Sequence, residues 1–518
     1  MSPAGSAGIA HESRRPTPVR GVRPGEAAQR NTASQARARA GWPERIAVAV
    51  VMLLAVALRV HGLSTFPLEQ DELYTVDEGT FLLHSELRPG IAARPLYYLL
   101  VHPMLMGLPQ TPVLLRLLPF LFGVGGIVAV WWLARRTLGR TAGLVAAIFV
   151  AISPWHLYAS GMARYWSLVF LLAALSYALI PRAIDRDDRR AYLLAFVVLL
   201  LGSLTHPSFL FPMSGAILGA HLVKADGRLG LRWPTAVAWR WLWGPYALAM
   251  VAVAVVVRGL THSSGLTNWN GRGAAADLRL IPAVVEWATP VMFAAAITGV
   301  VLLFREHTAI RRRWAAMSGL GILASLVALI ASSTKTNTYA DYAMGALPLV
   351  LVTAAALVQL IGERIGIPDA DAPGVPVPVS SWLMAGGVTA ALVAGVLPAT
   401  VSHLIDGTRF DYRPAYRRIS AVAPAELVVT GPIGPPEYYG PGLRLADISA
   451  DTAGLAAKVR QEHALWVVAS EKRYGLVGDD GGALQAWLLA RCHLELVTQR
   501  PRLDDRLYRV DLFHCEDH

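Results

Sequence analysis

The chain has 518 residues, of which 54% are hydrophobic and only 16% are charged, and its mean hydropathy is +0.44. Ordinary soluble domains carry about 25% charged residues, so the composition excludes a protein of that class. Charge-poor runs of about 20 residues recur between 42 and 401, and runs of that length cross a hydrocarbon core of about 30 Å. The sequence therefore predicts a polytopic α-helical membrane protein.

The formal net charge of +11 has a distribution that argues against nucleic acid as a partner. The basic residues gather in the N-terminal tail and in short clusters between apolar runs. That pattern is typical of cytoplasmic loops that face anionic lipid. We therefore expect a lipid bilayer, and no nucleic acid, as the partner of these charges.

The N-terminal part is predicted to start in the cytoplasm. Residues 1–41 are rich in Arg, Ala, Gly, Ser and Pro, and we interpret them as a disordered basic tail. The first span then runs over 42–62 and leads to an outer loop at 63–112 that is rich in acidic residues. Arg59 and His61 lie near the outer end of this span, where we expect their side chains to reach the interface.

The segment 96–108 decides the orientation of everything that follows. It is apolar but short, and it contains Pro103, so we interpret it as an interfacial or re-entrant helix that does not cross. With this choice the strong basic clusters fall on the cytoplasmic side. The result is about eleven crossings with the C-terminus outside. The predicted spans are 42–62, 113–134, 142–160, 166–180, 192–205, 208–223, 241–257, 280–304, 314–332, 343–361 and 382–401.

The C-terminal part changes in character after a proline-rich linker at 362–381 and the last span. We divide the chain into the tail, a transmembrane domain at 42–401 and a small extracytoplasmic α/β domain at 402–518. Short strands are predicted at 426–430, 465–469, 493–499 and 506–512, and a helix at 483–490. Cys492 and Cys515 both fall in this domain, where a disulfide and two unpaired thiols are both open.

The pair Asp71–Glu72 is the sharpest local feature, because it follows the first span closely in PLEQDELYT. A carboxylate at the bilayer surface can accept the proton of an acceptor hydroxyl or help to hold a divalent cation such as Mg²⁺ or Mn²⁺. The alternative is that both are solvated loop acids.

Several other polar side chains are candidates for binding a phosphate or a substrate. Arg116 lies inside the apolar run LLRLLPF, and Arg164 lies at an outer boundary where the positive-inside bias does not place it. The alternative for both is snorkelling or an ion pair with a loop acid. His206, Lys335 and Tyr339 also lie at outer span ends, where a simple interfacial anchor is the competing interpretation.

Other chemistries lack sequence support. There is no Walker loop, dinucleotide fingerprint, HExxH, GxSxG or paired CxxC. A transporter would place ionisable groups near the middle of the membrane. Here they gather at the outer ends of the spans.

Taken in order, these segments resemble the GT-C glycosyltransferases of the protein O-mannosyltransferase and aminoarabinose-transferase type, often called family 39. DELYT follows the first span, and RPLYYLLVHP resembles the family's HPPLYY-type segment. LRLLPFLFG, the run LARRTLGRTAGLVAAIFVAISPWHLYASGMARYWSL, THPSF and YADYAMGALPL follow in the family's order. The likeness is dense over 45–210.

The resemblance implies an enzyme that moves a sugar from a polyprenyl-phosphate donor to a protein, glycan or lipid acceptor on the outer side of the plasma membrane. It implies Asp71 as the base, Glu72 as its support or as a metal ligand, and Arg116 and Arg164 as arginines near the active site. Single displacement would invert the anomeric centre.

Two departures from the family pattern leave alternatives open. Many relatives carry an acid just before the arginine that matches Arg164, whereas Ala163 precedes it here, and relatives often read Arg-Tyr where this chain has Asp341–Tyr342. Lys335 is expected to take the place of the arginine that relatives have at the position of Asp341. A non-catalytic protein that binds lipid-linked sugar, and a transporter, remain the alternatives.

Overall fold

A computed structural model describes residues 42–80, 91, 94–263, 276–334, 338–365, 379–430, 438–447, 452–470, 482–503 and 508–517. The tail at 1–41, Lys335 and most of the linker at 362–381 lie outside these residues. The chain divides into two compact units, Met1–Ala49 and Val50–His518. Helix α2 starts in the first unit, and the other helices and strands belong to the second. The predicted domain boundary after 401 stays a prediction.

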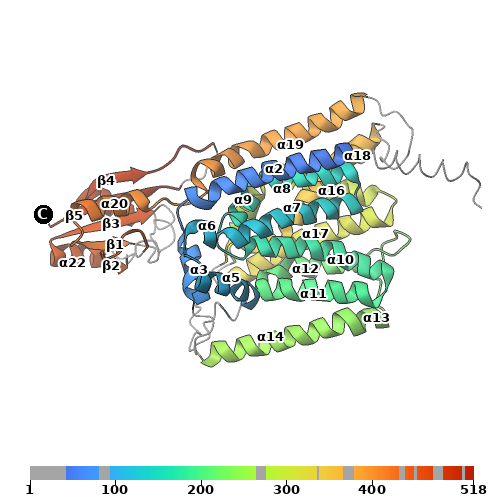
Figure 1. Cartoon of the computed structure of the whole chain (residues 1–518), viewed down its shortest axis with the longest axis horizontal. Coiled ribbons are helices and arrows are strands. Elements are labelled where there is room, and N and C mark those ends of the chain that lie inside the picture. The colour runs from blue at the N-terminus through green and yellow to red at the C-terminus, as the bar shows by residue number, and fades with distance from the viewer. Residues whose placement is uncertain are drawn as a thin grey trace, which may run out of the picture. The chain divides into compact units, whose positions relative to one another are not determined.

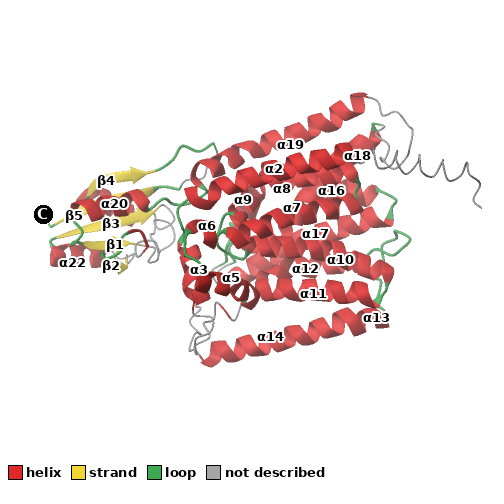
Figure 2. Ribbon diagram, in the orientation of Figure 1, coloured by secondary structure: helices red, strands yellow, loops and turns green. Residues whose placement is uncertain are grey.

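The second unit is mostly helical (Figures 1 and 2). The first half of the chain forms α2 (Trp42–Thr65), α3 (Gln70–Thr80), α5 (Pro95–Gly107), α6 (Pro112–Leu115), α7 (Leu117–Thr137), α8 (Arg140–Ile152), α9 (Pro154–Ser160), α10 (Trp166–Arg186), α11 (Arg189–Thr205), η1 (Pro207–Phe209) and α12 (Leu210–His221). The second half adds α13 (Ala236–Ala238), η2 (Trp239–Trp243), α14 (Gly244–Ser263), α15 (Leu280–Ala288), α16 (Pro290–Arg305), α17 (Ala309–Ser333), η4 (Ala340–Ala346), α18 (Leu347–Arg364) and α19 (Val379–Asp406).

Within the described residues, six helices are long and apolar enough to cross a membrane, and up to eight do so if each of two bent pairs is one span. The polytopic helical fold is therefore confirmed, whereas the count of about eleven crossings stays a prediction. The segment predicted to be re-entrant forms α5, a helix of 13 residues. It packs against α3, where Gly79 lies so close to Leu105 that a Cβ would approach it to 2.5 Å.

The two bends follow from local sequence. The axis turns by 64° between α8 and α9, where Ser153 caps the new helix by accepting from the His156 N–H and Pro154 takes its first position. It turns by 93° between α15 and α16 at Thr289, which has a φ of 68°, and Pro290. Proline lacks a donor for the preceding turn, so each helix starts afresh there. The bends bring Tyr158 against Trp287, with ring centroids 5.0 Å apart.

The C-terminal segment forms a sheet with the order β2-β1-β3-β5-β4 (Figure 1). Its elements are α20 (Arg413–Val422), β1 (Leu427–Thr430), β2 (Arg444–Asp447), α22 (Thr452–Glu462), β3 (Ala464–Ser470), α24 (Ala483–Arg491), β4 (His493–Thr498) and β5 (Val510–Glu516). Strands β2, β1 and β3 are parallel, and β5 runs antiparallel to both β3 and β4. The predicted α/β character is confirmed.

Strand β3 is buried on both faces because side chains alternate along a strand. Leu465 and Val467 pack in one cluster with residues of α22 and α24. Trp466 and Val468 pack in another with Tyr416 and Ile419 of α20. Cys492 and Cys515 form a disulfide that ties the end of α24 to β5, which decides between the two alternatives left open by the sequence.

Candidate active site

The acidic pair lies in the first turn of α3, and its two members have different surroundings. Successive residues on a helix point about 100° apart, so one member can face the protein while the other faces outward. The side chain of Glu72 is fully buried, whereas that of Asp71 is 54% exposed. The pair predicted from the sequence is thus one buried anchor and one accessible carboxylate.

Glu72 is surrounded by donors. Its Oε1 accepts from the Nε of Arg116 at 2.8 Å and from the Ala163 N–H at 2.8 Å. Its Oε2 accepts from Arg116 at 2.9 Å, from Arg409 at 2.9 Å and from the Glu69 N–H at 3.0 Å. Burial opposes ionisation, but the two guanidinium groups outweigh it and lower the pKa of Glu72 to about 2. Glu72 is therefore an ionised structural centre with no accessible oxygen.

Arg116 uses its whole guanidinium group to hold the outer loop. Besides both oxygens of Glu72, it donates to the carbonyl oxygens of Gly62, Leu63, Phe66 and Pro67 at 2.8–3.2 Å. A guanidinium has five N–H donors, and none remains for a phosphate. The geometry favours the ion-pair alternative for this residue over the phosphate site.

Arg409 was not among the residues singled out from the sequence. It follows a tight reversal after α19 in which Gly407 and Thr408 have φ values of 72° and 59°. Its guanidinium donates to Glu72, to the Pro67 carbonyl at 3.2 Å and to the Gly161 carbonyl at 2.7 Å. It lies 337 positions from Glu72 in the sequence, so no local pattern pairs them.

Arg59 also differs from the expectation. The sequence predicted that its side chain reaches the interface, and that prediction is wrong, since the side chain is only 2% exposed. It donates to the carbonyl oxygens of Ala55, Val150 and Ala151 and contacts Nδ1 of His156 at 2.6 Å. The carbonyls of Val150 and Ala151 lie in the last turn of α8, where the bend to α9 ends the helical bonding, and this makes an internal site for the charge.

Asp71 faces a second basic cluster on the accessible side of α3. Its Oδ1 lies 3.8 Å from a terminal nitrogen of Arg164, which also donates to Thr75 Oγ1 at 3.2 Å. Arg164 lies over the ring of Tyr165 at 5.2 Å from the centroid, and Arg94 lies over the same ring at 5.0 Å. The sequence reasoning passed over Arg94, although it opens the quoted segment RPLYYLLVHP.

The two arginines of this cluster retain donors. Within the described part of the chain, the Nε atoms of Arg94 and Arg164 are buried without a hydrogen-bond partner. Burial disfavours the charge of Arg164, but Tyr165 and Asp71 raise its pKa above its ordinary value. Two fixed cations with unused donors suit an anionic ligand.

His206 closes the same cluster. Its ring stacks on Tyr165 with centroids 4.7 Å apart, and Tyr342 packs edge-on at 5.0 Å. Nδ1 accepts from the Ser208 N–H at 3.1 Å, so in the neutral ring Nε2 carries the hydrogen. Burial, and then the charges of Arg94 and Arg164, hold the pKa of His206 well below its usual range. His206 is therefore a neutral donor beside the arginines.

The remaining predicted residues are less central. Tyr339 is 48% exposed and contacts the cluster through Tyr342, with centroids 6.2 Å apart. Lys335 lies outside the described residues. Asp341, where relatives often have arginine, accepts from the indole N–H of Trp155 at 3.1 Å and so fixes α9.

The predicted metal site does not fit the geometry. A divalent cation needs several free oxygens, and the Glu72 carboxylate already accepts five hydrogen bonds. Among the residues that the structure describes, no group of three His, Cys, Asp or Glu side chains is arranged to hold a metal ion.

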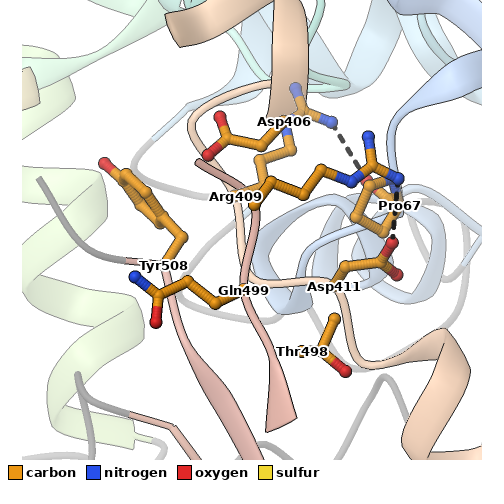
Figure 3. A pocket seen from close by; sticks show the side chains of 8 residues that line it. Pro67, Asp406, Arg409, Asp411, Thr498, Gln499 and Tyr508 are labelled. Atoms are coloured by element: carbon orange, nitrogen blue, oxygen red, sulfur yellow. Dashed lines mark hydrogen bonds and ion pairs between the residues drawn. The ribbon is translucent and has the colours of Figure 1, made fainter. Parts of the chain in front are cut away.

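A pocket beside Arg409 is too small to hold a substrate. Figure 3 shows Arg409 and Pro67 lining it together with Thr498, Gln499 and Tyr508 of the C-terminal segment. Its volume is about 10 Å³, enough for roughly one water molecule. Arg500, which also lines the pocket, donates a hydrogen bond to the carbonyl of Ile405 near the end of α19 at 2.6 Å.

We predict that Glu72→Gln lowers the free energy of unfolding by about 3 kcal/mol or more at pH 7, because it leaves two buried cations without a counter-charge. Since the folded-state pKa of Glu72 is lowered to about 2 from 4.5, its stabilisation is complete above pH 4.5 and is lost as the pH falls toward 2. The difference in the free energy of unfolding between wild type and Glu72→Gln should shrink as the pH falls from 4.5 toward 2. Thermal unfolding in detergent at pH 7 and pH 3 measures it.

Glu462→Gln is the matched control, since it removes a surface ion pair with Arg444. It should cost less than about 1 kcal/mol. If Glu72→Gln proves no more destabilising than this control, the anchoring role of Glu72 is wrong.

Comparisons with known proteins agree with this architecture. Residues 103–257 match the model of the dolichyl-phosphate-mannose-protein mannosyltransferase family. The chain is similar to the crystal structure of ArnT from Cupriavidus metallidurans in the apo state, with a TM-score of 0.52 and 14% identity over 92% of this chain and 98% of that chain. ArnT bound to undecaprenyl phosphate gives a TM-score of 0.51 with the same identity and coverage. No curated protein sequence matches. The chain thus has the fold of ArnT, and together with the family match over 103–257 this confirms the resemblance to GT-C superfamily glycosyltransferases.

Proposed function

We propose that the protein is a membrane glycosyltransferase that moves a sugar from a polyprenyl-phosphate donor to an acceptor hydroxyl. The observation that carries the proposal is the accessible carboxylate of Asp71, 3.8 Å from Arg164 in a cluster that also contains Arg94. A base beside two cations with unused donors suits a reaction that deprotonates one group and releases an anion. ArnT, which shares the fold, has been crystallised with undecaprenyl phosphate.

The proposed step is a single displacement. The acceptor oxygen forms a bond to the anomeric carbon as its proton passes to the Asp71 carboxylate. The bond from the anomeric carbon to the phosphate oxygen breaks, and its electron pair leaves with the polyprenyl phosphate. Attack opposite the leaving group inverts the anomeric centre.

The cations act on the leaving group. Arg94 and Arg164 would bind the phosphate and stabilise its growing charge, and both are positioned by the ring of Tyr165. His206 would donate from Nε2, and Tyr339 and Lys335 would contribute at the edge of the site. Fixed donors cost little reorganisation when the charge develops.

The orientation of the chain in the membrane decides on which side the reaction takes place. We propose a multi-pass protein of the plasma membrane with a cytoplasmic N-terminus and an extracytoplasmic C-terminus, which places Asp71 and the acceptor outside. A protein, a glycan or a lipid could serve as the acceptor. The polyprenyl tail would stay in the bilayer while its phosphate reaches the arginines.

Asp71→Asn should reduce transfer by about 100-fold to 10,000-fold, the usual contribution of a general base. Because the side chain is 54% exposed, the unfolding midpoint should not change. The assay follows the loss of radiolabel from a polyprenyl-phosphate sugar in reconstituted lipid. Asp77→Asn, an exposed acid on the same helix, is the control and should retain activity. Equal transfer by wild type and Asp71→Asn would remove Asp71 from the mechanism, and release of label by neither protein would favour a binding protein or a transporter.

Arg94→Gln and Arg164→Gln should each weaken binding of polyprenyl phosphate by about 10-fold to 100-fold, the value of one charge-assisted hydrogen bond. Arg279→Gln, a surface arginine paired with Asp277, should bind like wild type. Competition of polyprenyl phosphate against a fluorescent analogue gives the affinities. Wild-type affinity in both cluster variants would place the phosphate elsewhere.

A further inference from the structure

The C-terminal segment contacts the short connection that leads from α2 into α3. Arg413, at the start of α20, donates to the Thr65 carbonyl at 3.2 Å. The hydroxyl of Tyr439, which lies between β1 and β2, accepts from the backbone N–H of Leu68 at 2.5 Å. Arg409 contacts the same connection, as described above. The C-terminal segment therefore holds the entry to α3 at these three points.

The contact of Tyr439 lies directly before the first turn of α3. The Glu69 carbonyl accepts from the Glu72 N–H at 3.0 Å, so Glu69 is the N-cap residue of this helix. The Glu72 carboxylate accepts from the Glu69 N–H, which is half of a capping box. Leu68, the residue before the cap, is buried. Tyr439 thus binds the last peptide group before the cap, three residues from Asp71.

Tyr439 is itself fixed from two sides. Its side chain packs against the hydrophobic core of the helices and also against the cluster of the sheet that contains Tyr416 and Trp466. Burial raises the pKa of Tyr439 to about 12, so the hydroxyl is neutral at physiological pH. A ring held between two cores presents its oxygen to the Leu68 N–H in one position.

The two anchors of the first turn of α3 act on different groups. Glu72 holds the turn by its side chain, whereas Tyr439 holds the peptide group before it. A turn with one anchor can pivot about it, and a second anchor fixes its direction. The cations of the candidate site lie on other segments, since Arg94 precedes α5 and Arg164 precedes α10. A change at Tyr439 therefore moves Asp71 relative to a phosphate that stays in place.

We propose that Tyr439 is a positioning residue for Asp71 and that the C-terminal segment acts on sugar transfer through this contact. The inference rests on the proposed transfer reaction. A single hydrogen bond contributes only about 1 kcal/mol to stability. The rate is more sensitive to geometry, because a misplacement of about 1 Å can cost about 100-fold. The hydroxyl of Tyr439 therefore matters more for the rate of transfer than for the stability of the fold.

The test is a single turnover of the full chain in reconstituted lipid. The protein is in excess over the radiolabelled polyprenyl-phosphate sugar that wild type turns over fastest, so the rate constant does not depend on the amount of folded protein. Tyr439→Phe keeps the ring and removes the acceptor oxygen. It should slow transfer by about 3-fold to 30-fold and leave the affinity for polyprenyl phosphate unchanged. Tyr416→Phe is the matched control, since it removes a hydroxyl that contacts Thr430 at 2.9 Å in the same segment. It should transfer like wild type.

A double variant separates positioning from a general loss of structure. Because Tyr439 acts through Asp71, the combination of Asp71→Asn with Tyr439→Phe should transfer at the rate of Asp71→Asn alone. Independent effects would multiply, and that outcome overturns the proposal. Wild-type transfer by Tyr439→Phe, or equal slowing by Tyr416→Phe, overturns it as well.

Hydrogen exchange tests the contact without the reaction. Peptides that cover 66–73 should exchange faster in Tyr439→Phe than in wild type, and Tyr416→Phe should leave their exchange unchanged. If wild type releases no label from the lipid, the proposed function is wrong, and the exchange measurement then decides on the contact alone. Equal exchange of these peptides in Tyr439→Phe and wild type overturns the role of Tyr439.

Discussion

The buried carboxylate of Glu72 is the contact on which the candidate site depends. It joins α3 to Arg116 at the start of α7, to the backbone before α10 through Ala163, and to Arg409 after α19. These partners come from three distant parts of the sequence, so the ion cluster fixes where α3 begins. Breaking such a cluster is costly because an unpaired buried charge remains. Because Asp71 is the neighbour of Glu72 in the first turn of α3, the cluster around Glu72 also fixes the position of Asp71.

Two neighbouring acids therefore divide structural and chemical roles. Glu72 is surrounded by donors and buried, whereas Asp71 reaches the accessible side, where Arg164, Arg94 and His206 gather around Tyr165. Donors that are satisfied inside the protein hold the fold, and donors that are left over can meet a ligand. Arg116 donates all its N–H groups to Glu72 and to backbone carbonyls, whereas the Nε of Arg164 has no hydrogen-bond partner.

Much of this was predictable from the sequence, and the rest depends on tertiary structure. Apolar runs and the proline in 96–108 predict the helices and the short α5, and short apolar segments predict β1, β3 and β4. The last strand was predicted at 506–512, whereas β5 runs over Val510–Glu516. Strand β2 and helices α20 and α22 were not predicted, because they are short or polar. Asp71, Arg164 and His206 were selected by their place at span ends, and the structure brings them together. Arg409 could not be found this way, because only the fold closes the 337-residue separation from Glu72.

A structure of the full chain with polyprenyl phosphate bound tests the account most directly. Cryo-electron microscopy in lipid nanodiscs at a resolution that shows side chains would locate the phosphate. The account predicts that it lies within hydrogen-bond distance of Arg94 and Arg164, on the Asp71 side of α3, while Glu72 keeps its contacts with Arg116 and Arg409. A phosphate bound to Arg116 or Arg409, with Glu72 displaced, would contradict the division of roles between the two acids.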